Sequence, residues 1–150
     1  MDTQASLDAG LLVGRQDAVT GCQPAAVPKA RAVILSDYAK GVLDAATIKA
    51  IIAAARKAGV PVVVDPKKSD PSVFDGATLL TPNLEEMAQF SGIRAEDDGL
   101  AEAACRAVLA KVKVEAILVT RGAGGMTLCE RDRPAIHVPA ETHRVFDVTG

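Results

Sequence analysis

The sequence predicts an α/β domain with a mostly parallel sheet, and three observations support this. Short, uninterrupted apolar segments alternate with amphipathic helical segments along most of the chain. The apolar segments lack polar alternation, which is typical of strands buried on both faces. The first strand, helix and strand fall within about 35 residues, the length of a βαβ unit whose strands pair in parallel.

The first βαβ unit is predicted from a helix between two apolar runs. Residues 32–35 form the first strand, and a helix over 44–58 follows it. Apolar side chains recur there at helical spacing: Ile48, Ile51, Ile52 and Ala55. Asp44 is suited to cap the helix and Gly59 to end it. The apolar run 60–64 is the second strand.

The later elements continue this alternation and end in a hairpin. Predicted strands lie at 77–80 and 116–119, helices at 83–91 and 100–111, and hairpin strands at 126–129 and 135–138. Residues 1–30 show no period, so we expect an irregular lead-in there.

Composition limits the functional class. The chain has 150 residues, enough for one domain, with 49% hydrophobic and 24% charged residues, as in soluble globular proteins. No apolar run approaches the roughly 20 residues of a membrane span, and the acidic N-terminus does not resemble a secretory signal. A net charge of -2 argues against a nucleic-acid partner.

The few cysteines and histidines suggest no metal or redox motif. The three cysteines, Cys22, Cys105 and Cys129, are far apart in sequence, and we interpret them as free thiols of a cytoplasmic protein. His137 and His143 have no partner at metal-ligand spacing, so we interpret them as surface or strand residues.

Polar or glycine-rich clusters follow four predicted strands, at 36–41, 65–67, 81–83 and 120–122. Ligands of open parallel sheets bind beyond the carboxyl ends of the strands. The sequence therefore predicts a polar, mixed-charge site along one edge of the sheet.

Two of these clusters have both a structural and a functional interpretation. Asn83 and Glu86 fit a capping box, which is the structural interpretation. In the functional interpretation, the start of a helix that follows a strand binds anions. A nearby carboxylate can then hold Mg²⁺ directly or through water. The glycine-rich stretch 120–125 is either a turn into the hairpin or a loop whose backbone approaches a ligand. It matches neither a Walker A loop nor a dinucleotide fingerprint.

A third motif makes the set specific. Residues 147–150 read Asp-Val-Thr-Gly, and together with 83–86 and 120–125 they resemble the nucleotide half of the ribokinase-like (PfkB-type) carbohydrate kinases. The resemblance covers residues 31–150 and implies a three-layer α/β/α fold, here an incomplete domain. In that family the last motif continues as D-x-T-G-A-G-D. Its amides form an anion hole for the transferring phosphate, and its final Asp is the base, which would lie beyond Gly150.

The residue sequence at several strand ends resembles that of one subfamily, the D-glycero-D-manno-heptose 7-phosphate kinases. These kinases are often fused to an adenylyltransferase. The segments that carry this likeness are 36–41, 64–67, 79–86, 118–121, 125–128 and 146–150. This implies ATP-dependent phosphorylation of the anomeric hydroxyl of the sugar, in the synthesis of the ADP-heptose precursor of lipopolysaccharide.

The resemblance assigns roles by position. Asn83 and Glu86 match the residues at the nucleotide phosphates and Mg²⁺. The residues that match the nucleotide loop and the start of the anion hole are Thr120, Gly122, Gly125, Asp147, Thr149 and Gly150. Strand-end residues that face the cleft are Asp37, Lys40, Asp65 and Lys67. Lys67 is equally read as a solvated loop lysine, and Asp37 as a partner of turn amides.

The expected ligands are ATP, Mg²⁺ and a sugar phosphate, and neither nucleic acid nor membrane is expected as a partner. The chain by itself is further expected to be either self-associated or marginally stable. Without the base, the chain by itself is expected to be inactive. Two alternatives stay open: a ribokinase-like kinase for another sugar, or a non-catalytic nucleotide-binding α/β module.

Overall fold

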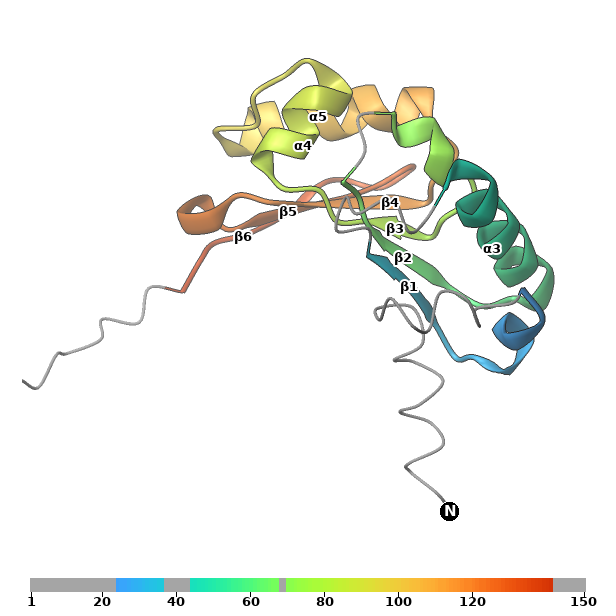
Figure 1. Cartoon of the computed structure of the whole chain (residues 1–150). Helices are drawn as coiled ribbons and strands as arrows, with labels where there is room; N and C mark the ends of the chain where they lie inside the picture. Colours follow the sequence, from blue (N-terminus) through green and yellow to red (C-terminus); the bar gives the residue numbers. More distant parts are fainter. Residues whose placement is uncertain (1–23, 37–43, 68–69, 142–150) are drawn as a thin grey trace, which may run out of the picture.

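The computed structural model describes residues 24–36, 44–67 and 70–141, which form a six-stranded sheet with helices packed against it (Figure 1). The strands lie side by side in chain order: β1 Val33–Ser36, β2 Val62–Asp65, β3 Leu79–Leu80, β4 Ala116–Thr120, β5 Met126–Glu130 and β6 Ile136–Val138. The first four are parallel, and β5 and β6 are antiparallel. The predicted α/β class, parallel sheet and C-terminal hairpin are confirmed.

The described ranges contain three α-helices, and local capping sets their ends. They are α3 Ala45–Ala58, α4 Leu84–Ser91 and α5 Asp98–Lys111. The side chain of Asp44 accepts from the Thr47 amide, and Gly59 ends α3 in the left-handed conformation, as predicted. Helix α5 starts two residues before the predicted position, because Asp97 accepts from the Leu100 amide and caps it.

The described part of the chain also has three short 3₁₀ helices, which the sequence pattern did not predict: η1 Pro24–Lys29, η2 Pro71–Phe74 and η3 Gly122–Gly124. Within the expected irregular lead-in, η1 packs against α3, and Val27 is buried in the core. A 3₁₀ helix of six residues, two of them prolines, is too short to show a helical period in the sequence.

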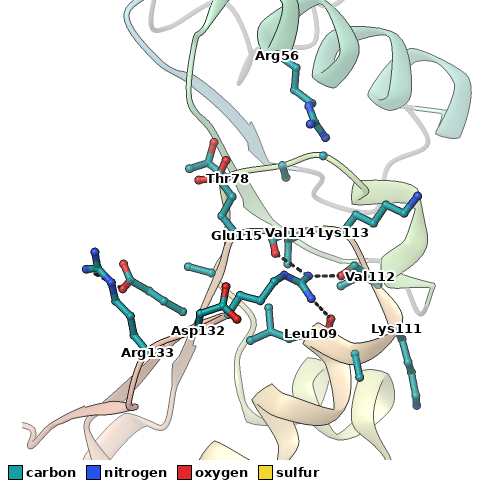
Figure 2. Close-up of a pocket in the computed structure, with 16 residues that line it drawn as sticks. Arg56, Thr78, Leu109, Lys111, Val112, Lys113, Val114, Glu115, Asp132 and Arg133 are labelled. Atoms are coloured by element: carbon teal, nitrogen blue, oxygen red, sulfur yellow. Dashed lines mark hydrogen bonds and ion pairs between the residues drawn. The ribbon is translucent and has the colours of Figure 1, made fainter.

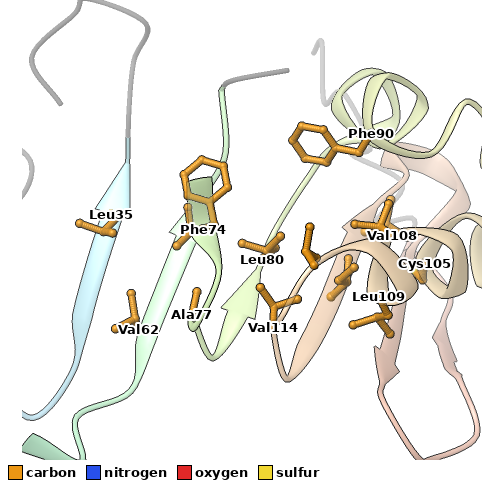
Figure 3. Packing of buried hydrophobic residues seen from close by; sticks show 14 of the residues in the cluster. Leu35, Val62, Phe74, Ala77, Leu80, Phe90, Cys105, Val108, Leu109 and Val114 are labelled. Atoms are coloured by element: carbon orange, nitrogen blue, oxygen red, sulfur yellow. The ribbon is translucent and has the colours of Figure 1, made fainter. Parts of the chain in front are cut away.

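The α-helices of the described residues lie on one face of the sheet (Figure 1). The strands accordingly bury alternate residues: Val33 and Leu35 of β1 are buried, whereas Ile34 between them is 55% exposed. Figure 3 shows the resulting core, to which strand residues such as Leu80 and helix residues such as Val108 of α5 both contribute. The expected cover of both faces is therefore seen on one face only in this part of the chain. An uninterrupted apolar strand sequence therefore does not distinguish a sheet covered on both faces from a sheet covered on one.

Two further expectations concern helices and thiols. Among the helices of the described ranges, none has the length and apolar character needed to cross a bilayer. Cys105 on α5 and Cys129 on β5 are both buried and carry free thiols, as expected.

Candidate functional site

The carboxyl ends of the parallel strands meet at one edge of the sheet, as the sequence predicts. Ser36 at the end of β1 pairs in register with Asp65 at the end of β2. Beyond β3, Asn83 forms an isolated parallel bridge with Thr120, and the Thr120 amide donates to the Pro82 carbonyl over 3.0 Å. The fold thus brings Asp65, Asn83 and Thr120 to a common edge.

Lys67 joins two of the predicted site residues. Its Nζ lies 3.2 Å from Oδ1 of Asp65 and 2.8 Å from Oε1 of Glu86. The hydroxyl of Ser36 donates to Oδ2 of Asp65 over 3.3 Å. Lys67 is therefore no freely solvated loop lysine: with 29% of its side chain exposed, it links the end of β2 to the start of α4.

The surroundings keep the Lys67 ammonium charged. The hydrogen bond with Glu86 raises the pKa of Lys67 above its ordinary value, and Asp65 acts in the same direction. Partial burial opposes both by disfavouring the charged form. Lys67 is therefore suited to electrostatic and positioning roles, and unsuited to act as a proton acceptor near neutral pH.

Asn83 and Glu86 form a complete capping box. Oδ1 of Asn83 accepts from the Glu86 amide over 2.9 Å, and Oε2 of Glu86 accepts from the Asn83 amide over 2.8 Å. The structural interpretation of this motif is thus confirmed. It does not exclude a ligand, since the exposed residues Leu84 and Glu85 begin the same helix.

The described residues contain no cluster of side chains that would hold a metal ion through protein ligands alone. No group of three or more His, Cys, Asp or Glu side chains within the described ranges could hold a metal ion. Glu86, the expected Mg²⁺ ligand, already accepts from Lys67 on one oxygen and from Asn83 on the other. Each oxygen of Glu86 thus has one donor and keeps a further lone pair that a cation or a water could use. Contact between Glu86 and Mg²⁺, directly or through water, stays a proposal.

The turn after β4 is exposed at its tip and closely packed at its end. Gly122 has φ +54° and open space around its Cα, and Gly122, Ala123 and Gly124 are exposed. Gly125 has φ +81°, and a Cβ there would overlap the carbonyl oxygen of Val138 on β6. Packing against β6 is thus reason enough for a glycine at 125, whereas nothing in the described structure requires one at 122 except its φ.

Sequence reasoning missed a buried arginine beside this turn. Arg121 is only 7% exposed, and its Nη2 donates to Oδ1 of Asp98, the first residue of α5. Oδ1 of Asp98 also lies 3.7 Å from Nδ1 of His137, which is 2.9 Å from the hydroxyl of Thr127. These four side chains join α5 to the turn and to both hairpin strands. No local pattern indicates this, because Asp98 and Arg121 are 23 residues apart.

A pocket lined by described residues lies elsewhere, at the amino ends of β3 and β4 (Figure 2). It is an open hollow of about 800 Å³ bordered by both positive and negative side chains. Arg131, which lines it, donates to the carbonyls of Leu109, Val112 and Val114 and so satisfies the backbone that ends α5. This hollow does not contain the predicted site residues, so we place the candidate site at the carboxyl edge.

Some predicted residues lie outside the described ranges. These are Asp37, Lys40, Asp147, Thr149 and Gly150 among the site residues, and Cys22 and His143 among the others. His137 is half-buried on β6, as expected for a strand residue.

Comparison with known proteins places these features in one family. The model of the pfkB family of carbohydrate kinases matches residues 15–150, beginning before the expected residue 31. The chain is 51% identical over 124 residues to the bifunctional protein HldE of Nitrobacter hamburgensis, covering 83% of the chain and 25% of that protein. It is 46% identical over 151 residues to HldE of Rhodopseudomonas palustris, covering 99% and 30%.

Solved structures share the fold at low sequence identity. Ribokinase of Arabidopsis thaliana, complexed with ribose and ATP, has a TM-score of 0.64 at 24% identity, over 77% of this chain and 37% of that one. Phosphofructokinase-2 from Escherichia coli, in complex with potassium, has a TM-score of 0.66 at 17% identity, over 82% and 41%. The chain spans about a quarter of the length of the curated relatives it matches.

Proposed function

This chain belongs to the pfkB family of carbohydrate kinases, and we propose that it is the nucleotide-binding part of a cytoplasmic heptose kinase. The whole protein would transfer the γ-phosphate of ATP to the anomeric hydroxyl of D-glycero-D-manno-heptose 7-phosphate. The choice of sugar rests on the residue sequence at the strand ends, which resembles that of the heptose 7-phosphate kinases. The similarity to HldE over a quarter of that protein's length supports the same choice.

One observation carries the proposal: the bridge between Asn83 and Thr120. It joins the start of α4 to the end of β4, and so brings the N-x-x-E motif beside the first residue of the glycine-rich turn. In parallel sheets this edge is where ligands bind, and phosphoryl transfer depends mainly on positioning and charge. Two family motifs that are far apart in sequence therefore have the proximity that binding one nucleotide requires.

The proposed division of labour follows from the chemistry of each group. The first turn of α4 would face the phosphates, with its amides and dipole favouring negative charge. The exposed backbone of Gly122 would lie along the nucleotide. Lys67 would hold Glu86 in place between α4 and β2, and Asp65 would share that charge. Mg²⁺ would accompany ATP and neutralise charge on its phosphates, with Glu86 reaching it directly or through water.

The remaining roles rest on the resemblance alone. Asp147, Thr149 and Gly150 would begin the anion hole, and Asp37 and Lys40 would face the sugar. The base that accepts the proton of the sugar hydroxyl would be the final Asp of the D-x-T-G-A-G-D motif. Removal of a general base typically lowers a rate by roughly 10² to 10⁴, so the 150-residue chain by itself should be inactive.

The test compares two proteins and three acceptors. The full-length protein that contains this chain is incubated with ATP, Mg²⁺ and heptose 7-phosphate, fructose 6-phosphate or ribose. Of the three acceptors, we expect only heptose 7-phosphate to cause ADP release. Its product should show the ³¹P signal of an anomeric phosphate. The 150-residue chain should release none.

Each other outcome rejects a defined part of the proposal. Turnover of fructose 6-phosphate or ribose in place of the heptose would reject the substrate and leave another ribokinase-like kinase. A full-length protein that binds ATP without transferring phosphate would favour a non-catalytic nucleotide-binding module. Robust turnover by the pure 150-residue chain would contradict the assignment of the base.

A further inference from the structure

We propose that Arg121 is a positioning residue that fixes the turn Gly122–Gly124, through its ion pair with Asp98, in the conformation that receives the nucleotide. The inference rests on the proposed function, and it adds two residues that the family motifs do not include. It follows from how the turn, the arginine and α5 are packed together.

The turn is built on the backbone of Arg121. The Arg121 amide donates to the Gly125 carbonyl over 2.8 Å, and the Gly124 amide donates to the Arg121 carbonyl over 3.0 Å. The Gly125 amide closes the turn by donating to the Gly122 carbonyl over 3.0 Å. Any movement of Arg121 would therefore move the exposed glycines.

The side chain of Arg121 also packs against the backbone of the turn at Gly124. A Cβ built on Gly124 would lie 3.3 Å from both Cβ and Nη1 of Arg121, so the backbone of Gly124 rests directly on the arginine. The guanidinium is planar and rigid, which makes it a firm support. If the Arg121 side chain moved away from Gly124, the turn would lose the surface against which it packs.

Asp98 fixes the position of the guanidinium. It is the first residue of α5, and its carboxylate accepts from Nη2 of Arg121. The side chain of Arg121 is 4% exposed, whereas that of Asp98 is 60% exposed. The pair thus connects a helix packed on the core to a turn exposed at the candidate site.

One feature of Arg121 is costly for a purely structural residue. Its Nε is buried and has no hydrogen-bond partner among the described residues. Buried donors are nearly always paired, and an unpaired one is destabilising. Violations of such local rules concentrate at functional sites, where a required geometry outweighs the loss of stability. A turn held in one conformation for a ligand is such a requirement.

The experiment uses the full-length protein and three variants. Arg121→Met removes the charge and keeps much of the length, Arg121→Lys keeps the charge, and Asp98→Asn removes the partner's charge. Small displacements in a binding site have large kinetic effects, so we expect Arg121→Met to raise the KM for ATP by about tenfold or more. Asp98→Asn should raise it in the same direction, and Arg121→Lys should recover part of the loss. The KM for the sugar should be unchanged.

Arg106 provides a matched control on the same helix as Asp98. Its guanidinium donates to the carbonyls of Glu130 and Arg133, so it also ties α5 to the hairpin, without contact to the turn. Arg106→Met should lower the melting temperature and leave the KM for ATP unchanged.

Two outcomes would overturn the inference, and they are distinguishable. If Arg121→Met lowers the melting temperature as Arg106→Met does, with no change in the KM for ATP, Arg121 is structural only. If the unaltered full-length protein binds no non-hydrolysable ATP analogue by calorimetry, the proposed function fails, and the positioning role fails with it.

Discussion

The ammonium of Lys67 lies 2.8 Å from Oε1 of Glu86, and this pair connects the end of β2 to the first turn of α4. Glu86 is 9% exposed and uses its other oxygen to cap α4. A lysine that follows one strand thereby stabilises the helix that follows the next strand. The carboxyl edge is thus held together by charge as well as by the backbone ladder.

The pH dependence of this pair has a definite sign. Because the hydrogen bond with Glu86 raises the pKa of Lys67 in the folded protein, its contribution to stability is fully present below the unfolded value of 10.5. That contribution is lost as the pH rises through the higher folded pKa. The difference in melting temperature between the unaltered chain and Lys67→Met should therefore stay constant from pH 7 to about 10 and narrow above it. A difference that disappears by about pH 9 would contradict this pairing.

Asn83→Ala separates the two interpretations of the capping box. Loss of the cap should destabilise the protein by about 1 kcal/mol, measured by denaturant unfolding. If Asn83 also contacts phosphates, the KM for ATP of the full-length protein should rise as well.

The control for this test is Asp44→Ala, which removes the corresponding cap of α3. It should reduce stability by a similar amount and leave the KM for ATP unchanged. If neither variant changes the KM, Asn83 acts as a cap alone.

Gly122 and Gly125 both have a positive φ, yet they should respond differently to alanine. Gly125→Ala places a Cβ onto the Val138 carbonyl, so we expect severe destabilisation and loss of the β5–β6 pairing. At Gly122 a Cβ meets nothing within 4 Å, so the cost should be only the roughly 1–2 kcal/mol of a left-handed alanine.

Circular dichroism melting and ATP kinetics of the full-length variants would measure both effects. If the backbone of Gly122 lies along the nucleotide, Gly122→Ala should raise the KM for ATP despite its mild effect on folding. Equal melting temperatures for the two variants would show that the turn does not pack against β6 as described.

Local signals account for the parts of the fold that the sequence predicted well. The period of α3, its cap Asp44 and its stop Gly59 lie within one continuous segment, as does the capping box of α4. Strand β3 is shorter than expected, with two residues in place of 77–80. Of its predicted first half, the Ala77 amide donates to the Phe74 carbonyl of the preceding 3₁₀ helix, whereas the Thr78 amide still donates to the Val62 carbonyl of β2.

Side-chain pairing between elements was beyond the sequence. The strand-end rule brings Asp65 and Asn83 to one edge, yet it does not predict that Lys67 reaches across to Glu86, because that depends on the orientation of α4. The Arg121–Asp98 pair likewise depends on how α5 packs over β4. Charge pairing of this kind needs the tertiary structure.

The exposed face of the sheet leads to the last prediction, which concerns the isolated 150-residue chain. Ile34 is 55% exposed and Ile136 is 54% exposed, on strands whose other side packs against the helices. Met126 and Val138 extend this apolar surface across the hairpin. Large exposed apolar patches are usually covered by association, so we expect the chain to self-associate with rising concentration.

The double variant Ile34→Lys/Ile136→Lys should reduce this association, measured by light scattering at several concentrations. Leu100→Lys is the matched control, because Leu100 is 42% exposed on helix α5, away from the open sheet face. It should leave the association unchanged, since charge added there does not interrupt the apolar surface of the strands. A chain that is monomeric at every concentration would contradict the prediction. Equal effects of the two substitutions would instead indicate that net charge, and not this face, controls the association.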